Sequence, residues 1–560
     1  MTVQRVKPGQ GSATSGGAGG VEDGVGYMAG AELRAGAAST ISCYEPATMI
    51  PLGEVGIDSR DDVLAAVARA RSAQSDWSQT SFSERRRVLR ILLKRVLQHA
   101  DEICLQIVRD SGKTRENAMM GEIWPVVEKL RWTIAHGEKH LRSERVSSGL
   151  FLHKKATIEF HPLGVIGVIC PWNYPFQNIL GPIIPALFAG NACVVKVSEW
   201  VAWSSERFAL LLDDALREAG VSPDLLQIVQ GHAEAGRAVV QSGVDKIIFT
   251  GSVDNGRKVL ADTAQNITPV ILELGGKDAL IVCDDAHLEQ AAHAAMAGVF
   301  INCGQNCLAS ERVLVFDGIY DRFEGEVLRM ASQLRQGASS ETRTVDLSAI
   351  VSAIQLEHID KLVARAVQQG ARVLLGGKRG ADDGQFYQPT ILADVTPEME
   401  IMNEELFGPV MLLCRVRDET QAVEIANGTN FGLSCTVMSK SVERAERMGR
   451  QIQSGSLSIN DYGLTYMAQD LPFGGVKTSG FGRLNGREGL RGCTNIKAVL
   501  TDRWPIHMPA KLYPVGRWDY DVTRGVLRSI YGRGLSAKAS AAKDLLTTLG
   551  RMAADRKRRS

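Results

Sequence analysis

Two stretches of the chain alternate short β-branched segments with amphipathic segments, and this alternation restricts the fold more than any other feature. Helical patterns at 204–219 and 233–242 separate the short segments of the first stretch. Strands that alternate with helices form a parallel sheet with helices on both faces, so we expect an α/β domain here. The short segments are VIGVIC (165–170), ACVVKV (192–197), LLQIVQG (225–231) and DKIIFTG (245–251).

A second stretch of the same kind follows, with helical patterns at 287–300, 318–335 and 354–369. A chain of 560 residues is too long for one hydrophobic core. We therefore expect two α/β domains with a cleft between them. The apolar segments of the second stretch are DALIVC (278–283), ERVLVF (311–316), ARVLLGG (371–377), VMLLCRV (410–416) and CTVMSK (435–440).

The two ends differ in composition from the middle. Residues 1–40 are rich in glycine and alanine, and we expect a flexible tail with structure beginning near Ile41. The spacing of leucine and alanine over 535–560 predicts an amphipathic helix with a basic end. Between the tail and the first sheet, the patterns predict two helices within 59–99, a third over 101–110, a long one over 115–141 and a two-stranded excursion over 145–162.

Charge and cysteine content exclude several classes of protein. The formal net charge of +1 gives no general attraction to nucleic acid. The ten cysteines include no C-x-x-C pair, which favours free thiols in a reducing compartment, and we expect a cytoplasmic protein. Four prolines interrupt the apolar stretch 163–195, so we expect it to be buried inside the protein rather than to span a membrane.

A dinucleotide-binding fold usually carries G-x-G-x-x-G after its first strand, and this chain lacks that pattern there. FTGSVDNG (249–256) takes a similar place, between a strand and a helical pattern. Its backbone N–H groups and the Ser252 hydroxyl can hold a phosphate at a helix N-terminus, although most such turns are only tight turns. Lys196 and Glu199 follow another buried strand, where they either contact a ribose or form a surface ion pair.

Two polar side chains have candidate catalytic roles. In CPWNYPF (170–176), two prolines fix the backbone around Asn173, whose amide can donate to a developing oxyanion. In LELGGKDA (272–279), Glu273 follows an apolar run, where a carboxylate at a domain junction can act as a general base. The alternatives are an ordinary turn asparagine and a surface glutamate.

VFINCGQNCLAS (299–310) places Cys303 four residues before Cys307. The nearest histidines, His287 and His293, lie on the preceding helical pattern, and no second cysteine pair is available, so no metal site is predicted. A reducing compartment disfavours a disulfide. Two packed thiols and a nucleophile are the remaining interpretations.

A thiol, an amide donor, a carboxylate base and a dinucleotide site are what the oxidation of an aldehyde to an acid requires. At these blocks the chain resembles the NAD(P)-dependent aldehyde dehydrogenases, most closely the plant family 22 branch. The resemblance runs from about Tyr44 to Arg503. It rests, in the family's order, on PWNYP (171–175), KVSE (196–199), FTGS (249–252), LELGGK (272–277), GQNC (304–307), EELFGP (404–409) and LPFGGVKTSGFGR (471–483).

The resemblance implies an α/β aldehyde dehydrogenase fold in three parts. A Rossmann-like NAD-binding domain covers 41–144 and 163–272, and an α/β catalytic domain covers 273–485. A small bridging β element for oligomerisation covers 145–162 and 486–503. Residues 504–560 are expected to form a C-terminal extension that contains the basic amphipathic helix.

The resemblance also implies roles for single residues. Cys307 is the nucleophile, Glu273 is the general base, and Asn173 donates to the oxyanion together with the backbone N–H of Cys307. Lys477 supports the active-site region. The residues implied in cofactor binding are Ile169, Trp172, Lys196, Glu199, Gly231, Gly251, Ser252, Leu274, Glu405 and Phe407.

We expect NAD as the cofactor, because the Glu199 carboxylate accepts a hydrogen bond from the ribose 2′-hydroxyl and repels a 2′-phosphate. NADP is the alternative, since Lys196 can partly offset that repulsion. The expected reaction is addition of the Cys307 thiolate to the aldehyde, hydride transfer to give a thioester, and hydrolysis by water that Glu273 activates.

The residues expected to line the substrate tunnel, which are neither plainly apolar nor plainly cationic, are Phe176, Gln177, Asn306 and Leu308. Because no Arg beside the nucleophile is available to clamp a second carboxylate, we expect aliphatic or aromatic aldehydes. The enzymatic alternative is a CoA-acylating aldehyde dehydrogenase, which Glu273 disfavours because such enzymes suppress the attack of water. The alternative from another class is a membrane-surface protein that keeps the fold and binds anionic lipid through its C-terminal helix. Docking of that helix on its own subunit is the favoured interpretation.

The family resemblance leads us to expect a homodimer or homotetramer. Cys303 is expected to be a small packed thiol. Its alternative role is to trap an oxidised Cys307 as a reversible disulfide, which protects Cys307 from irreversible oxidation.

Overall fold

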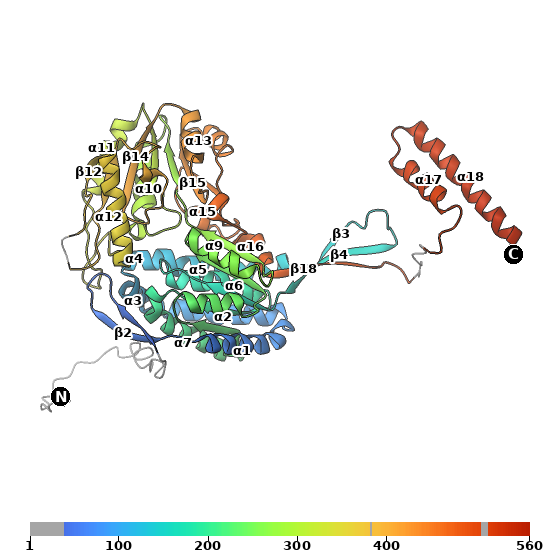
Figure 1. The fold of residues 1–560 in the computed structure, drawn as a ribbon, viewed down its shortest axis with the longest axis horizontal. Helices are drawn as coiled ribbons and strands as arrows, with labels where there is room; N and C mark the ends of the chain where they lie inside the picture. Colours follow the sequence, from blue (N-terminus) through green and yellow to red (C-terminus); the bar gives the residue numbers. More distant parts are fainter. Residues whose placement is uncertain (1–38, 381–382, 506–512, 560) are drawn as a thin grey trace. The chain divides into compact units, whose positions relative to one another are not determined.

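The computed structural model describes residues 39–380, 383–505 and 513–559 (Figure 1). The tail predicted over residues 1–40 lies outside this part, apart from its last two residues. The chain divides into two compact units. One comprises Met1–Glu144 and Ile158–Ala498, and the other comprises Arg145–Thr157 and Val499–Ser560.

The first sheet of the larger unit carries the first predicted strand series. Its strand order is β17-β9-β8-β5-β6-β7, and every neighbouring pair is parallel except β17 with β9. The chain runs from β5 outward to β6 and β7, then returns to β8 on the other side of β5. The switch point of the sheet therefore lies between β5 and β8, where open α/β sheets bind ligands. The strands are β5 (Val165–Ile169), β6 (Ala192–Lys196), β7 (Leu226–Val229), β8 (Lys246–Gly251), β9 (Val270–Leu274) and β17 (Gly480–Phe481).

Helices cover both faces of this sheet, which confirms the predicted α/β class. One layer contains α1 (Arg60–Ser78), α8 (Ala233–Gln241) and α9 (Val253–Thr263). The other contains α2 (Phe82–Gln98), α5 (Trp124–Leu141), α6 (Pro175–Phe188) and α7 (Ala202–Glu218). In α6, every residue except Asn178 is buried, so the proline-interrupted apolar stretch lies inside the protein as predicted.

The two helical patterns predicted within 59–99 are confirmed as α1 and α2, and Ser81 and Glu84 make the capping box that begins α2. One predicted helix is interrupted. The pattern over 115–141 forms α4 (Arg115–Ala118), a π-helical turn at Met119–Ile123 and α5. The preceding α3 (Ala100–Ser111) ends at Gly112 in the left-handed conformation.

The second sheet has the order β12-β13-β14-β11-β10-β15-β16, and only β12 runs antiparallel to its neighbour. The sequence did not predict its short strands β13 and β16. The strands are β10 (Ala279–Val282), β11 (Arg312–Phe316), β12 (Arg372–Leu375), β13 (Thr390–Ala393), β14 (Val410–Val416), β15 (Ser434–Met438) and β16 (Ser456–Ile459). Its helices are α10 (Leu288–Phe300), α11 (Tyr320–Ala331), α12 (Ala353–Gln368), α13 (Glu419–Asn427) and α14 (Val442–Gly449).

The predicted boundary between residues 272 and 273 falls inside β9, and β17 from the second predicted domain pairs with β9. This pairing sets Gly480 opposite Glu273, so the chain segment of the PFGGVKTSG block runs beside the predicted base. The short helices α15 (Leu464–Met467) and α16 (Gly486–Gly492) flank that block.

The remaining strands form two small sheets. β1 (Thr40–Tyr44) and β2 (Pro51–Gly56) pair antiparallel, and β18-β4-β3 form a three-stranded sheet. Its strands are β3 (Glu144–Val146), β4 (Lys154–Pro162) and β18 (Thr494–Asp502), so the predicted two-stranded excursion gains a third strand. Two helices that pack on each other, α17 (Asp519–Tyr531) and α18 (Leu535–Arg559), end the chain. Among the described residues, no helix has the length and apolar character that membrane crossing requires.

Candidate active site

The loop that carries Cys307 leaves α10 through a left-handed turn. Asn302, Cys303 and Gly304 have φ values of 51°, 56° and 71°. A Cβ on Gly304 would collide with the carbonyl oxygen of Gly408, so only glycine fits there. The Gln305 side chain then fixes the loop, because its Oε1 accepts from the N–H of Val351 at 2.9 Å. The turn directs residues 305–307 away from the helix axis.

Cys307 lies in an apolar and aromatic environment. It packs with a buried cluster of Leu308, Leu433 and Phe473, and the Tyr466 ring meets Phe473 edge-on at 4.8 Å. The thiol is partly exposed, whereas those three cluster residues are buried. Hydrocarbon and ring surface therefore lies on one side of the sulfur.

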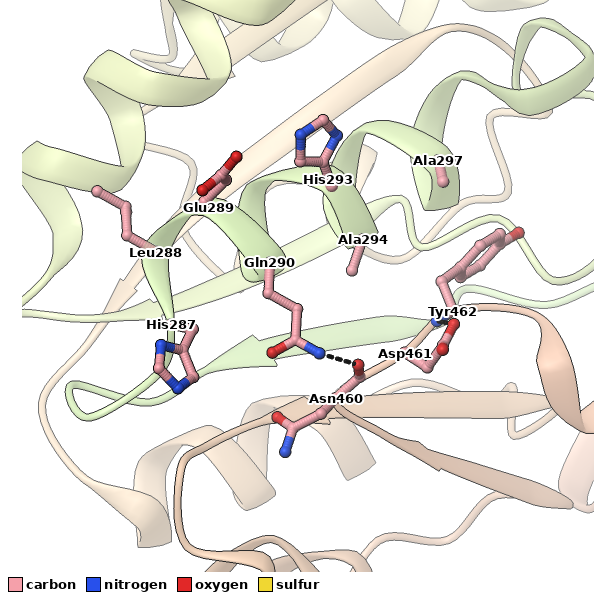
Figure 2. A pocket seen from close by; sticks show the side chains of 10 residues that line it. All are labelled: His287, Leu288, Glu289, Gln290, His293, Ala294, Ala297, Asn460, Asp461 and Tyr462. Carbon is pink, nitrogen blue, oxygen red and sulfur yellow. Dashed lines mark hydrogen bonds between the residues drawn. The ribbon is translucent and has the colours of Figure 1, made fainter.

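Hydrogen bonds from Tyr462 hold the residues on either side of Cys307. The Asn306 Nδ2 donates to the Tyr462 Oη at 2.9 Å, and that hydroxyl donates to the Leu308 carbonyl at 3.2 Å. The Tyr462 ring also lines a hollow of about 610 Å³ between α10 and residues 460–462 (Figure 2). None of the predicted catalytic residues lines this hollow, so we do not place the chemistry there.

Glu273 is the next-to-last residue of β9, and its carboxyl interacts with the Cys307 thiol. Its carboxyl is only 3% exposed, and within the described chain its Oε1 has no hydrogen-bond partner. Burial raises the pKa of Glu273 to about 7. Burial and the Glu273 charge raise the pKa of Cys307 well above its usual value. A carboxyl that can hold or release a proton near neutral pH thus adjoins a thiol that must lose one.

Asn173 lies in the turn between β5 and α6, and it is 5% exposed. Its Nδ2 donates to the Gln305 carbonyl at 3.2 Å, and its Oδ1 accepts from the Asn178 Nδ2 at 3.2 Å. The amide of Asn173 therefore lies against the loop two residues before the nucleophile. Together with the contact of Glu273 and Cys307, this places all three predicted catalytic residues around one loop.

The predicted cofactor residues gather at the carboxyl edge of the first sheet. β5, β6, β8 and β9 end at or beside the predicted residues, and Gly231 follows β7 by two residues. The Lys196 Nζ lies 3.6 Å from the Glu199 carboxylate, and the Ser252 hydroxyl caps α9. A partly exposed carboxylate beside a lysine at one strand end and a serine-capped helix N-terminus at another form a donor set that fits a dinucleotide. The edge residues are Ile169, Lys196, Gly231, Gly251, Ser252 and Leu274.

A second loop, residues 405–407, carries the two remaining predicted cofactor residues. The buried Glu311 holds this loop, since its Oε1 accepts from the N–H of Phe407 at 2.9 Å, and Lys277 pairs with Glu311. The Glu405 Oε1 accepts from the N–H of Gly276 at 3.1 Å, three residues after Glu273. Burial and the Glu311 charge raise the pKa of Glu405 to about 8.

The ring of Phe407 meets that of Trp172 edge-on at 5.6 Å, so two predicted cofactor residues from loops beside different sheets are in contact.

Lys477 holds backbone carbonyls of a neighbouring loop. Its Nζ donates to the carbonyls of Asn427 and Thr429 at 2.8 and 3.0 Å.

The tunnel prediction is wrong for Phe176. This side chain is fully buried in the core of the first sheet and meets Phe208 edge-on at 5.0 Å, because α6 turns it inward. Gln177, the next predicted tunnel residue, donates a hydrogen bond to the Tyr466 hydroxyl. Tyr466 packs against the same cluster as Cys307, so Gln177 lies near the nucleophile loop.

Cys303 faces away from the chemistry. Its sulfur accepts from the Ser348 N–H at 3.2 Å and donates to the Ser348 carbonyl at 3.1 Å.

Sequence reasoning missed several residues that shape the site, because their interactions depend on partners far along the chain. They are Lys113, Glu122, Glu311, Tyr462 and Tyr466.

Comparison with known proteins gives this geometry its context. The sequence model of the Aldehyde dehydrogenase family matches residues 33–499 of the chain. The chain belongs to the aldehyde dehydrogenase family. It is accordingly an oxidoreductase that acts on aldehydes, which confirms the predicted family and enzyme class.

Individual proteins are similar to this chain in sequence or in structure. An aldehyde dehydrogenase-like protein of Schizosaccharomyces pombe is 39% identical over 510 residues, covering 89% of this chain and 97% of that protein. The NAD⁺ complex of an aldehyde dehydrogenase from Bacillus cereus superposes with a TM-score of 0.78 at 32% identity, covering 83% and 94%. An NADP-dependent enzyme of E. coli superposes with a TM-score of 0.79 at 31% identity, covering 83% and 95%.

Proposed function

We propose that this enzyme oxidises an aldehyde to a carboxylic acid through a thioester on Cys307. The contact between the buried Glu273 carboxyl and the Cys307 thiol carries the proposal, because it joins a base to a nucleophile. The Asn173 amide, held against the same loop, supplies the oxyanion donor. Rapid mixing with an aldehyde and NAD tests it. The Cys307→Ala variant should form no NADH, and wild type should form acid without CoA.

The residues act in order. Once its proton has left, the Cys307 sulfur adds to the aldehyde carbon, and the carbonyl oxygen becomes an oxyanion that the Asn173 Nδ2 and the backbone N–H of Cys307 bind. A bound nicotinamide would supply the hydride acceptor for this intermediate. Collapse of the oxyanion leaves a thioester on sulfur. Glu273 takes a proton from water, the hydroxyl adds to the thioester carbon, and the C–S bond breaks to release acid and thiolate.

We propose NAD rather than NADP as the preferred cofactor. Glu199 supports this, because its carboxylate lies beside Lys196 and 3.8 Å from the His232 Nδ1 at the sheet edge, where it would meet a 2′-phosphate. Structures similar to this chain include both an NAD⁺ complex and an NADP-dependent enzyme. Equal catalytic efficiency with both cofactors would contradict the preference, and Glu199→Gln should narrow it.

We propose aliphatic or aromatic aldehydes as substrates, because Leu308, Leu433, Phe473 and Tyr466 surround the nucleophile. Glu273 argues against the CoA-acylating alternative, since a base beside the thioester promotes hydrolysis. An NADH-formation screen over charged, aliphatic and aromatic aldehydes, with and without CoA, separates these reactions. A best substrate with a carboxylate or ammonium group near its aldehyde would contradict the assignment.

We propose a homodimer or homotetramer, which the third strand, β18, of the predicted bridging sheet supports. Light scattering measures the oligomer. The ten free cysteines support the proposed cytoplasmic location.

Exposed Leu535, Leu546 and Leu549 on α18 favour testing the lipid-surface alternative as well. Flotation of the full chain against a 1–512 truncation on anionic vesicles should show no difference if the helices dock on protein.

A further inference from the structure

Lys113 and Glu122 form an ion pair that water does not reach. Lys113 follows α3, and Glu122 lies in the π-helical turn Met119–Ile123. The Lys113 Nζ lies 2.6 Å from the Glu122 Oε1, and both side chains are fully buried. Buried ion pairs add little net stability, because desolvation offsets their attraction. The pair therefore calls for an explanation in terms of the groups it holds.

Lys113 holds one end of the Asn173–Gln177 turn. Its Nζ donates to the Asn173 carbonyl at 2.8 Å and lies 4.0 Å above the Tyr174 ring. The Asn302 Nδ2, from the turn before the nucleophile, donates to the same carbonyl at 3.0 Å. Two donors from separate elements thus fix the backbone of Asn173.

Glu122 holds the other end of the turn. Its Oε2 accepts from the N–H groups of Phe176 and Gln177 at 3.0 and 2.9 Å. These donors belong to the first turn of α6, whose own N-cap residue, Tyr174, provides no side-chain hydrogen bond. A carboxylate from another helix therefore caps α6 and also favours its positive dipole end.

The π-helical turn makes this arrangement fit. It adds a residue to the helix between α4 and α5, and such bulges often occur at functional sites. Within it, a Cβ on Gly121 would lie 2.6 Å from the Tyr174 Cε1, so glycine permits the close approach of the PWNYP turn. The backbone from Asn173 to Gln177 is thus held at its two ends by residues 113–122.

We propose that the Lys113–Glu122 pair positions the Asn173 amide for oxyanion binding. The inference rests on the proposed function. These hydrogen bonds to its carbonyl and to the N–H groups of residues 176 and 177 restrict the backbone that carries the Asn173 side chain. A donor fixed before reaction stabilises developing charge without reorganising, which is the condition for oxyanion catalysis. Both are positioning residues, since neither is placed to touch the substrate.

The test is a double-mutant cycle between the pair and Asn173. Lys113→Met combined with Glu122→Gln removes the donor to Asn173 but leaves no unpaired buried charge, and the Gln Oε1 can still cap α6. We expect it to slow the NADH burst about 10- to 100-fold, as misplacement of a catalytic group does. Asn173→Ala should slow the burst about 100- to 1,000-fold. Addition of the pair variant to Asn173→Ala should cause no further loss.

The matched control is the other buried lysine–glutamate pair, Lys277 and Glu311, which holds residues 406 and 407 rather than Asn173. When the Lys277 and Glu311 double variant is combined with Asn173→Ala, the two fold-losses in burst rate should multiply. Cys307 alkylation, which needs no oxyanion donor, should keep its wild-type rate in the Lys113 and Glu122 variants, and thermal melting reports folding.

Three results would overturn the inference: multiplicative losses for Lys113 and Glu122 with Asn173→Ala, an unchanged burst in folded pair variants, or equal loss of alkylation and burst. Lys113→Met alone provides the same cycle if the double variant does not fold, because it removes the same donor to the Asn173 carbonyl. An unchanged burst in Asn173→Ala refutes the oxyanion assignment itself, and that result is separate from failure of the pair.

Discussion

Replacement of Glu273 by glutamine should have two effects: it should stabilise the fold of the enzyme, and it should greatly slow hydrolysis of the thioester. Burial carries this carboxyl from its ordinary pKa of 4.5 to about 7. At about 1.4 kcal/mol per pKa unit, ionising it in the folded state costs about 3 kcal/mol of folding free energy. A neutral glutamine of the same shape avoids that cost.

The sign follows from proton binding. Below pH 4.5 both folded and unfolded states hold the proton, so the charge penalty is absent. As pH rises from 4.5 to about 7, the unfolded chain ionises first and the folded state loses stability relative to it. Above pH 7 the loss is complete. Glu273→Gln should therefore match wild type in acid and exceed it by about 3 kcal/mol at pH 8.5.

The same variant should lose its general base. We expect a burst of about one NADH per subunit, followed by thioester hydrolysis that is about 100- to 10,000-fold slower. Wild-type turnover should rise with pH through about 7 as Glu273 deprotonates, and the variant should lack that limb. Stopped-flow absorbance measures the burst, and denaturant unfolding at about pH 4 and pH 8.5 measures stability.

Glu405→Gln is the matched control, since burial also raises the pKa of Glu405, to about 8, but its carboxylate faces Gly276. It should weaken cofactor binding and leave thioester hydrolysis intact. Steady-state turnover at the wild-type rate in Glu273→Gln refutes the base assignment. A stability difference from wild type that does not change with pH refutes the account of the charge.

The remaining predictions concern the supports of the site. Gly304→Ala should abolish activity and lower the melting temperature, because a Cβ there collides with the Gly408 backbone. Gly325→Ala is the control, since a Cβ there meets nothing; its activity should stay within a few per cent of wild type and its melting temperature within a few degrees. Lys277→Met should destabilise the enzyme by about 3–5 kcal/mol, since it leaves the Glu311 charge buried alone; chemical unfolding measures this. Cys303→Ser should not change peroxide inactivation or its reversal by thiol, and faster irreversible loss would contradict the packed-thiol interpretation.

Local patterns predicted most of the strands and helices. β-Branched runs separated by helical periodicity identified β5, β6, β7 and β8 because burial on both faces of a parallel sheet requires continuous apolar segments. The short strands β13 and β16 were not predicted. The π-helical turn at Met119–Ile123 was missed because one extra residue barely disturbs a helical pattern.

The sequence alone determined the reactive groups: a cysteine, a carboxylate and an amide in motifs that match a family's order. Tertiary structure decided what those groups experience. The pKa of Glu273 depends on burial beside Cys307, and the placement of Asn173 depends on Lys113 and Glu122, sixty and fifty-one positions earlier. The identity of a side chain is local, but its desolvation and hydrogen-bond partners are set by segments that only folding brings together.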